Sequence, residues 1–255
     1  MSRPAPEIVD PASERSPLLD TQSDHTEDDS VPPPAPSSLS LIASHSFQGS
    51  SALVAQIGIT VATVVLWRVL WTHPAGLFTY HPSFQSLALL GFLEGILLLQ
   101  PQPVNSTIKH KSLQLHQVCQ YSSLLLIVTG AAFIVYNKAV HGAKHFITWH
   151  ARCGLATLIL ILLQITFGAL MVYAPLQRVI FGGEGQAKRA WKYHRLSGYF
   201  TLTLLLVTPL LALASDWVIK HTDKWERWTI GVGLSAAGLA AFARVQTSKL
   251  GLKRN

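Results

Sequence analysis

The sequence predicts an all-α membrane protein with six transmembrane helices. Of its 255 residues, 49% are hydrophobic and only 13% are charged, a composition that is typical of membrane proteins. The hydrophobic residues also gather into six long runs. Each run has about the length that a membrane-spanning helix needs.

The six apolar runs define the expected helices in chain order. An α-helix rises 1.5 Å per residue, so about 20 residues cross a hydrocarbon core of about 30 Å. The runs cover residues 51–72, 82–100, 113–136, 148–173, 193–214 and 228–246. Because they leave only short loops, we expect one compact helical bundle, a single transmembrane domain over residues 49–247.

Residues 1–48 form a predicted cytosolic tail, rich in proline and serine, with eight acidic and two basic residues. Such a composition cannot bury enough apolar surface to fold, so we expect disorder. The tail lacks the basic and apolar regions of a signal peptide. Residues 14–19, ERSPLL, fit the acidic-dileucine form ExxxLL of sorting signals. This motif favours a vacuolar, lysosomal or endosomal membrane, with another endomembrane or the plasma membrane as the alternative.

Basic residues set the expected orientation. Of 20 Lys and Arg, 18 lie in residues 49–255, but no nucleic-acid motif accompanies them, and flanking of membrane spans explains them better. On one side of the membrane, the loops after the third and fifth runs contain four of these Lys and Arg residues. The other side, which we expect to be cytosolic, collects nine: Lys109, Lys111, Arg178, Lys188, Arg189, Lys192, Lys249, Lys253 and Arg254. Both termini, including a short basic tail at 248–255, are then cytosolic.

Four histidines stand at the leading ends of the second to fifth runs, at similar expected depths from each helix start: His81, His116, His150 and His194. Histidine inside a bilayer is costly and usually functional. Antiparallel neighbours start at alternating faces, which pairs His81 with His150 and His116 with His194. Imidazole is a suitable axial ligand of haem iron, and bundles build cofactor sites from facing side chains.

The central four helices are therefore expected to form a bundle that holds two haems, one near each face. Two imidazoles on one iron leave no position for oxygen and favour one-electron transfer. The sequence contains no CxxCH motif, so the haems are expected to be non-covalent b-type haems. For any one of these histidines alone, an interfacial hydrogen bond is the better explanation, but four at matching positions in successive helices favour the haem sites.

Other polar residues in or near the spans have less specific explanations. Arg68 is expected to reach the nearby membrane surface, and Glu94 either influences the inner haem, carries protons or is neutral by burial. Cys119 and Cys153 are interpreted as buried thiols. The remaining histidines, His45 among them, are interpreted as solvated, although His145 is a candidate for the outer haem edge. Aromatic residues at the run ends indicate an interfacial belt more simply than an electron relay.

The chain resembles the cytochrome b561 family, and most closely its stand-alone six-helix members. The resemblance rests on YHPSFQSLALLGFLEG, on the histidine early in the third run, on NKAVHGAKHFITWHARCG and on WKYHRLSGY, and covers residues 50–246. It implies a transmembrane reductase that takes electrons from cytosolic ascorbate. The implied acceptor across the membrane is monodehydroascorbate or a ferric chelate. The family's haem ligands carry over onto the four histidines named above.

The resemblance also implies an ascorbate site near Lys111, which lies five residues before His116. The arginine expected nine residues before His194 is replaced by Gly185, and Lys188, Arg189 or Lys192 are candidates to substitute for it. Ascorbate is an anion near neutral pH, so basic residues would raise its local concentration. The same residues would also serve simply to fix orientation.

Three other functions are compatible with the sequence. One is a quinol-linked cytochrome b subunit of a larger complex. Another is a haem-free transporter or scaffold that uses the histidines for protons or metals, although paired helix-breaking segments are not evident. The third is a haem sensor, for which the discriminating feature would be an appended signalling domain, and none is evident. The expected partners are the lipid bilayer, the donor and the acceptor, and a homodimer is left open.

Overall fold

The computed structural model describes residues 37, 40–41, 44–45, 47–103 and 105–246, and among these it contains helices and no strand. Its helices are α2 (Ser50–Thr72), α3 (Leu77–Leu99), α4 (Ser106–Val140), α5 (Trp149–Val172), α6 (Ala174–Phe181), α7 (Glu184–Ala212), α8 (Asp216–His221) and α9 (Lys224–Ala243). The expected all-α class is therefore confirmed. Most of the predicted disordered tail, the ExxxLL motif and the tail at 248–255 lie outside the described residues.

Five of these helices, α2, α3, α4, α5 and α7, are long and apolar enough to cross a membrane. The chain is thus a multi-pass membrane protein. The sixth predicted span corresponds to α9, which has 20 residues but is not among the five. The reason is its polar first turn, which contains Lys224, Glu226 and Arg227 and lowers the mean hydropathy of a short helix.

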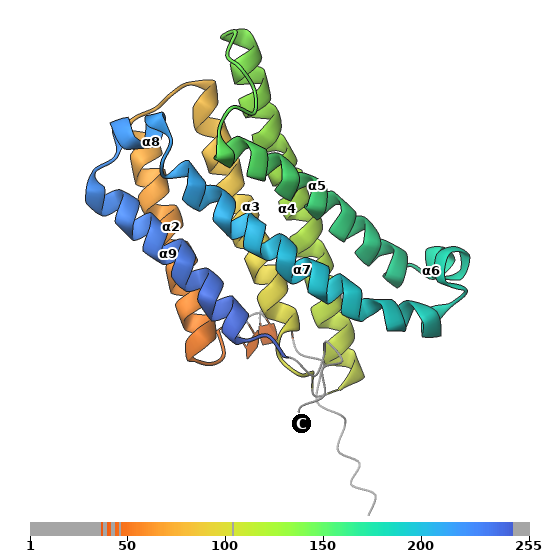
Figure 1. Cartoon of the computed structure of the whole chain (residues 1–255). Coiled ribbons are helices and arrows are strands. Elements are labelled where there is room, and N and C mark those ends of the chain that lie inside the picture. The colour runs from red at the N-terminus through yellow and green to blue at the C-terminus, as the bar shows by residue number, and fades with distance from the viewer. Residues whose placement is uncertain (1–36, 38–39, 42–43, 46, 104, 247–255) are drawn as a thin grey trace, which may run out of the picture. The chain divides into compact units, whose positions relative to one another are not determined.

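The long helices pack as pairs: α3 with α4, α5 with α7, and α2 with α9 (Figure 1). Buried aliphatic side chains of these helices form the core, among them Leu93, Leu97, Ile161, Leu202 and Leu234. The α2–α9 pair relies on small residues instead. A Cβ atom added to Gly58 would lie 2.6 Å from the carbonyl oxygen of Gly233, and the reverse distance is the same. Glycine at both positions lets the two backbones approach closely, as in many membrane helix pairs.

Two helices begin well before the apolar runs that predicted them. α4 starts at Ser106, where the Asn105 side chain accepts a hydrogen bond from the backbone N–H of Ile108 at 2.8 Å. α7 starts at Glu184. The expectation that the histidines have similar depths from each helix start is therefore wrong. His116 and His194 are each the eleventh residue of their helix, whereas His81 is the fifth and His150 the second.

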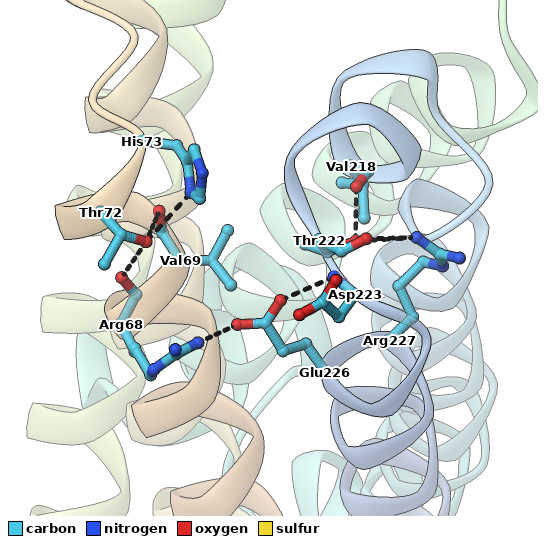
Figure 2. A network of polar contacts seen from close by, with 9 residues as sticks. All are labelled: Arg68, Val69, Thr72, His73, Val218, Thr222, Asp223, Glu226 and Arg227. Atoms are coloured by element: carbon cyan, nitrogen blue, oxygen red, sulfur yellow. Dashed lines mark hydrogen bonds and ion pairs between the residues drawn. The ribbon is translucent and has the colours of Figure 1, made fainter.

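A polar network joins α2 to the start of α9 (Figure 2). Arg68 forms an ion pair with Glu226, which is only 5% exposed. The other carboxylate oxygen of Glu226 accepts from the backbone N–H of Asp223 at 2.8 Å, within a capping box. Arg68 thus binds a partner on α9 rather than only reaching toward the membrane surface.

We predict that Gly58→Ala lowers the stability of the protein by about 1–3 kcal/mol, because the new methyl group must push the α2 and α9 backbones apart. The measurement is the thermal unfolding midpoint in detergent. Gly185→Ala is the matched control: it lies in α7, nothing lies within 4 Å of the added Cβ, and alanine favours a helix. Equal midpoints for the two variants would contradict the close-packing argument.

Candidate metal centre

The structure brings the four candidate histidines together as two pairs. At one end of the bundle, the imidazoles of His81 on α3 and His150 on α5 have ring centroids 6.1 Å apart, with an interplanar angle of 73°. Toward the other end, His116 on α4 and His194 on α7 line one cavity of about 620 Å³. Its apolar walls include Phe92, Ile161 and Leu205. Cavities of this size suit small organic ligands and cofactors.

Every one of the four rings makes a polar contact through its Nδ1 atom to the helix that packs antiparallel to its own. The contacts join His81 to the Gly130 carbonyl at 2.9 Å, His116 to the Gly95 carbonyl at 2.7 Å, His150 to the Thr208 carbonyl at 2.9 Å, and His194 to the Gln164 side chain at 3.1 Å. The contacts follow one rule. The residue that each ring contacts lies 14 positions after the histidine of its own helix. Fourteen residues are about four turns, or 21 Å along the helix axis.

The rule makes α3 with α4, and α5 with α7, two approximately symmetric antiparallel pairs. The first pair repeats the symmetry in its glutamines: Gln85 donates to the Ile127 carbonyl at 3.1 Å, and Gln120 donates to the Phe92 carbonyl at 3.3 Å. Each helix pair supplies one histidine to each end of the bundle. Both sites therefore lie between the two pairs, and the separation of the histidines along each pair fixes the separation of the sites.

The hydrogen bonds determine which ring nitrogen of each histidine has a free lone pair that could bind a metal. A carbonyl oxygen can only accept, so the Nδ1 atoms of His81, His116 and His150 carry the proton and donate it. Each Nε2 then keeps its lone pair. No hydrogen bond to the Nε2 of any of the four rings is found among the described residues. A metal-bound histidine has this arrangement: one ring nitrogen on the metal, the other donating to a fixed acceptor.

His194 differs from the other three. Its Nδ1 lies 3.1 Å from the side-chain nitrogen of Gln164, and the same amide donates to the His194 carbonyl at 2.5 Å. The amide oxygen of Gln164 accepts from the Ser197 hydroxyl at 2.8 Å. An Nδ1 that accepts from the amide leaves the ring proton on Nε2. Ligation of a metal by this Nε2 therefore requires the proton to leave and the hydrogen bond to Gln164 to change.

Glycines allow the close contacts around the histidines. A Cβ added to Gly130 would lie 3.0 Å from Phe84 Cβ and 3.2 Å from the His81 carbonyl oxygen. A Cβ added to Gly168 would lie 3.0 Å from Cε1 of His194. A larger residue at either position would displace a histidine or the backbone that precedes it, so these glycines form part of the site.

The donor set fits haem better than a bare ion. Among the described residues, no three His, Cys, Asp or Glu side chains group closely enough to bind a metal. Each site therefore offers two imidazoles and leaves the other positions to ligands that are not protein. A porphyrin supplies four nitrogens in a plane between two axial ligands. With metal–nitrogen bonds of about 2 Å on each side, two ring centres lie about 6 Å apart, as those of His81 and His150 do.

The mouth of the cavity at the His116 end is cationic. Its lining includes four basic side chains: Lys109, Lys188, Arg195 and Arg244. Lys109 and Arg195 both lie over the Trp191 ring, with their charged groups 5.7 and 5.9 Å from its centroid. Both contacts hold positive charge beside the cavity.

The candidate substrate residues from the sequence take different places. Lys188 lines the cavity and forms an exposed ion pair with Glu184 at 2.8 Å, whereas Lys111, Arg189 and Lys192 are not among the residues that line it. The candidate His145 lies in the exposed α4–α5 loop, at the end of the bundle that holds His81 and His150.

Sequence reasoning missed His45 and Arg244. His45, interpreted as a solvated tail residue, lines the cavity, and its Nδ1 lies 3.1 Å from the Leu98 carbonyl. Arg244 donates to the carbonyls of His45 and Gln48 at 3.0 and 2.8 Å, and to the Gln100 side chain at 2.9 Å. No local pattern around either residue predicts these contacts, because the partners lie far apart in the sequence.

Glu94 lies on α3 beside Gly95, the hydrogen-bond partner of His116. Its carboxylate accepts a hydrogen bond from Gln56 on α2 at 2.6 Å. The two cysteines, Cys119 and Cys153, are free and half-buried, which agrees with their interpretation as thiols.

Comparisons with known proteins identify relatives. The model of the eukaryotic cytochrome b561 family matches residues 80–219 of the chain. The chain is 27% identical to the transmembrane reductase CYB561D2 of Bos taurus over 172 residues, which are 66% of this chain and 73% of that protein. The human and mouse proteins of the same name are 26% and 28% identical, with the same coverage. The matched region contains all four histidines.

We predict that Gln164→Leu weakens the binding of haem at the His194 site by about 10- to 100-fold, because the His194 ring loses its hydrogen bond to the Gln164 side chain. Titration of haem-depleted protein with haemin measures the affinity. Gln85→Leu is the control, since Gln85 bonds to the Ile127 carbonyl and does not line the cavity that contains His194. A similar loss in both variants would mean that the Gln164 contact serves packing alone.

Proposed function

The chain belongs to the eukaryotic cytochrome b561 family, and on this premise we propose that it is a transmembrane reductase with two b-type haems. The electrons would come one at a time from cytosolic ascorbate and would pass to monodehydroascorbate or a ferric chelate on the other side. The observation that carries the proposal is the pair of sites, each with two imidazoles from different helix pairs. Three of the four rings have the hydrogen-bonded Nδ1 that ligation through Nε2 requires.

His81 and His150 would hold one haem, and His116 and His194 the other. Bound haem supplies a centre that accepts and releases single electrons. The protein's part would be to fix the rings, to surround the sites with apolar side chains and to supply two imidazoles to each iron, which would favour electron transfer over oxygen binding. The rise of about 21 Å between the levels of the two histidines of one helix pair would put one centre toward each membrane face.

The cationic mouth is the proposed entrance for the donor. Ascorbate is an anion near neutral pH, and a concave site with positive charge raises the local concentration of anions. Lys109, Lys188, Arg195 and Arg244 line the cavity that also contains His116 and His194. Lys109 lines this cavity, whereas Lys111, the residue that the family resemblance implied, is not part of its lining. An ascorbate bound at this mouth would lie beside the cavity that the proposed inner haem occupies.

The proposed topology has six spans and cytosolic termini. α9 packs along α2, and its polar first turn would lie at the non-cytosolic surface, where the Arg68–Glu226 pair stabilises it. The mouth of the cavity then faces the cytosol, together with the loops that are richest in Lys and Arg.

We predict that single His→Ala substitutions separate the two haems. His116→Ala and His194→Ala remove the same haem, and His81→Ala and His150→Ala remove the other, because each pair supplies both axial ligands of one iron. Reduced-minus-oxidised optical spectra during a titration with ascorbate measure each haem. Loss of one haem by both His81→Ala and His116→Ala would refute the pairing. A colourless wild-type protein purified with ample haem would refute the proposed function.

We predict that Lys109→Glu and Lys188→Glu each raise the KM for ascorbate about three- to tenfold at low salt, because each reverses a charge at the mouth. The rate of haem reduction against ascorbate concentration gives the KM. Lys192→Glu is the control, since Lys192 lies one turn after Lys188 but does not line the cavity. Equal effects of all three substitutions would indicate general surface charge rather than a site.

A further inference from the structure

Besides His81 and His150, the same end of the bundle holds another pair of imidazoles, those of His73 and His221. His73 follows the last residue of α2, and His221 is the last residue of α8. Their ring centroids are 5.6 Å apart, with an interplanar angle of 62°. His73 is exposed and His221 is half-buried, so the pair is accessible from outside the bundle. Neither the family resemblance nor the haem sites use these two residues.

Hydrogen bonds again occupy Nδ1 in both rings. The Nδ1 of His221 lies 2.8 Å from the Trp217 carbonyl, which can only accept. The Nδ1 of His73 lies 3.0 Å from the Thr72 hydroxyl oxygen (Figure 2). That hydroxyl directs its own proton to the carbonyls of Arg68 and Val69, at 3.0 and 3.2 Å, so it accepts from His73. Both rings therefore carry the proton on Nδ1 and keep a lone pair on Nε2.

The pair has the spacing of a two-histidine metal site. An ion bound to two imidazoles by bonds of about 2 Å lies about 3 Å from each ring centroid, so the centroids are about 4.5 Å apart when the ligands are at a right angle and about 6 Å apart when they face each other. The value for His73 and His221 is 5.6 Å, close to the 6.1 Å of His81 and His150. No hydrogen bond to either Nε2 is found in the part of the chain that the structure describes. We propose that His73 and His221 together bind a transition-metal ion that prefers nitrogen ligands, such as copper, zinc or iron.

The ion would be exchangeable rather than structural. Among the described residues, no third His, Cys, Asp or Glu joins the pair to complete a metal site. Two protein ligands leave the other coordination positions to water or to a chelator, as in metal sites that must accept a ligand from solution. The pair thus suits a metal ion that arrives as a small chelate.

Ring contacts connect this pair to His81. The His221 ring stacks on Trp217 with centroids 4.7 Å apart, Trp217 lies 5.0 Å from Phe78, and Phe78 lies 6.5 Å from His81. All these distances fall within the range of aromatic contact. In the reductase, a metal ion held by His73 and His221 would dock beside the outer haem ligand. This role as the acceptor site rests on the proposed function, whereas metal binding by the pair does not.

Metal binding can be tested with Cu²⁺ on the full chain purified in detergent. At one equivalent, the electron paramagnetic resonance spectrum is expected to show two coupled nitrogens. His73→Ala and His221→Phe are each expected to weaken binding at least about tenfold and to remove one nitrogen. Phenylalanine at 221 keeps a ring against Trp217. His141→Ala is the control, because the His141 Nδ1 also bonds a carbonyl, that of Asn137 at 2.7 Å, while His141 lies outside the pair.

The outcomes separate the two proposals. A double variant combines His73→Ala with His221→Phe. An unchanged Cu²⁺ affinity and spectrum in this double variant would overturn the metal site, whether or not the protein contains haem. The acceptor role is tested by the rate at which the ascorbate-reduced protein reduces a ferric chelate. That rate is expected to fall at least about tenfold in the double variant, with the haem spectrum and its reduction by ascorbate unchanged. An unchanged rate despite lost Cu²⁺ binding would overturn the acceptor role alone.

Discussion

The hydrogen bond between each histidine Nδ1 and the opposite helix is the constraint on which the bundle depends, and in His81, His116 and His150 the Nδ1 is the donor. An imidazole buried among apolar side chains needs a partner for its N–H group, because an unpaired buried donor costs about 1–3 kcal/mol. A helix carbonyl already bonded within its own helix has a second lone pair to offer. The ring can reach that carbonyl only if the helices approach closely, which explains the glycines at positions 95 and 130.

The bonds also fix the register of the helices. In the α3–α4 pair, His81 bonds to α4 and His116 bonds to α3, so a slide of one turn, about 5.4 Å, would break both bonds together. The α5–α7 pair has the same reciprocal design. Once the two pairs are in register, facing histidines of different pairs come together at each end. The positions of both proposed metal centres therefore follow from local contacts within each pair, and α2 with α9 packs alongside as a third pair.

The sequence predicted the parts of the fold that depend on long-range apolar patterning. Its six runs correspond to the six long helices. The first turn of α9 is polar, so this helix is not among the five that are long and apolar enough to cross a membrane. The sequence could not predict the starts of α4 and α7, because their first turns are polar and resemble loops. The short helices α6 and α8 were missed because eight and six residues are too few to show a periodic apolar pattern.

At the site, the four histidines were visible because each stands alone in an apolar run. Their Nδ1 partners were not visible, because a backbone carbonyl has no sequence signature. Arg68 shows the same limit: its partner Glu226 lies on a distant helix, and only the fold brings the two charges together. His45 was hidden because its neighbours in the tail have the composition of a disordered segment, while its contact with α3 depends on the folded bundle.

The two ends of the bundle present different chemistry to their surroundings. One end has a cavity whose mouth carries lysine and arginine, and these side chains attract anions but do not ligate metals. The other end has a second imidazole pair and an aromatic ring series, which suit a metal ion, and the cation beside it, Arg227, donates to the Ile219 and Thr222 carbonyls. A single small anion serving as both donor and acceptor would need similar sites at both ends. The difference favours a donor and an acceptor of different chemical classes, with an anion at the cationic mouth and a metal chelate at the imidazole pair.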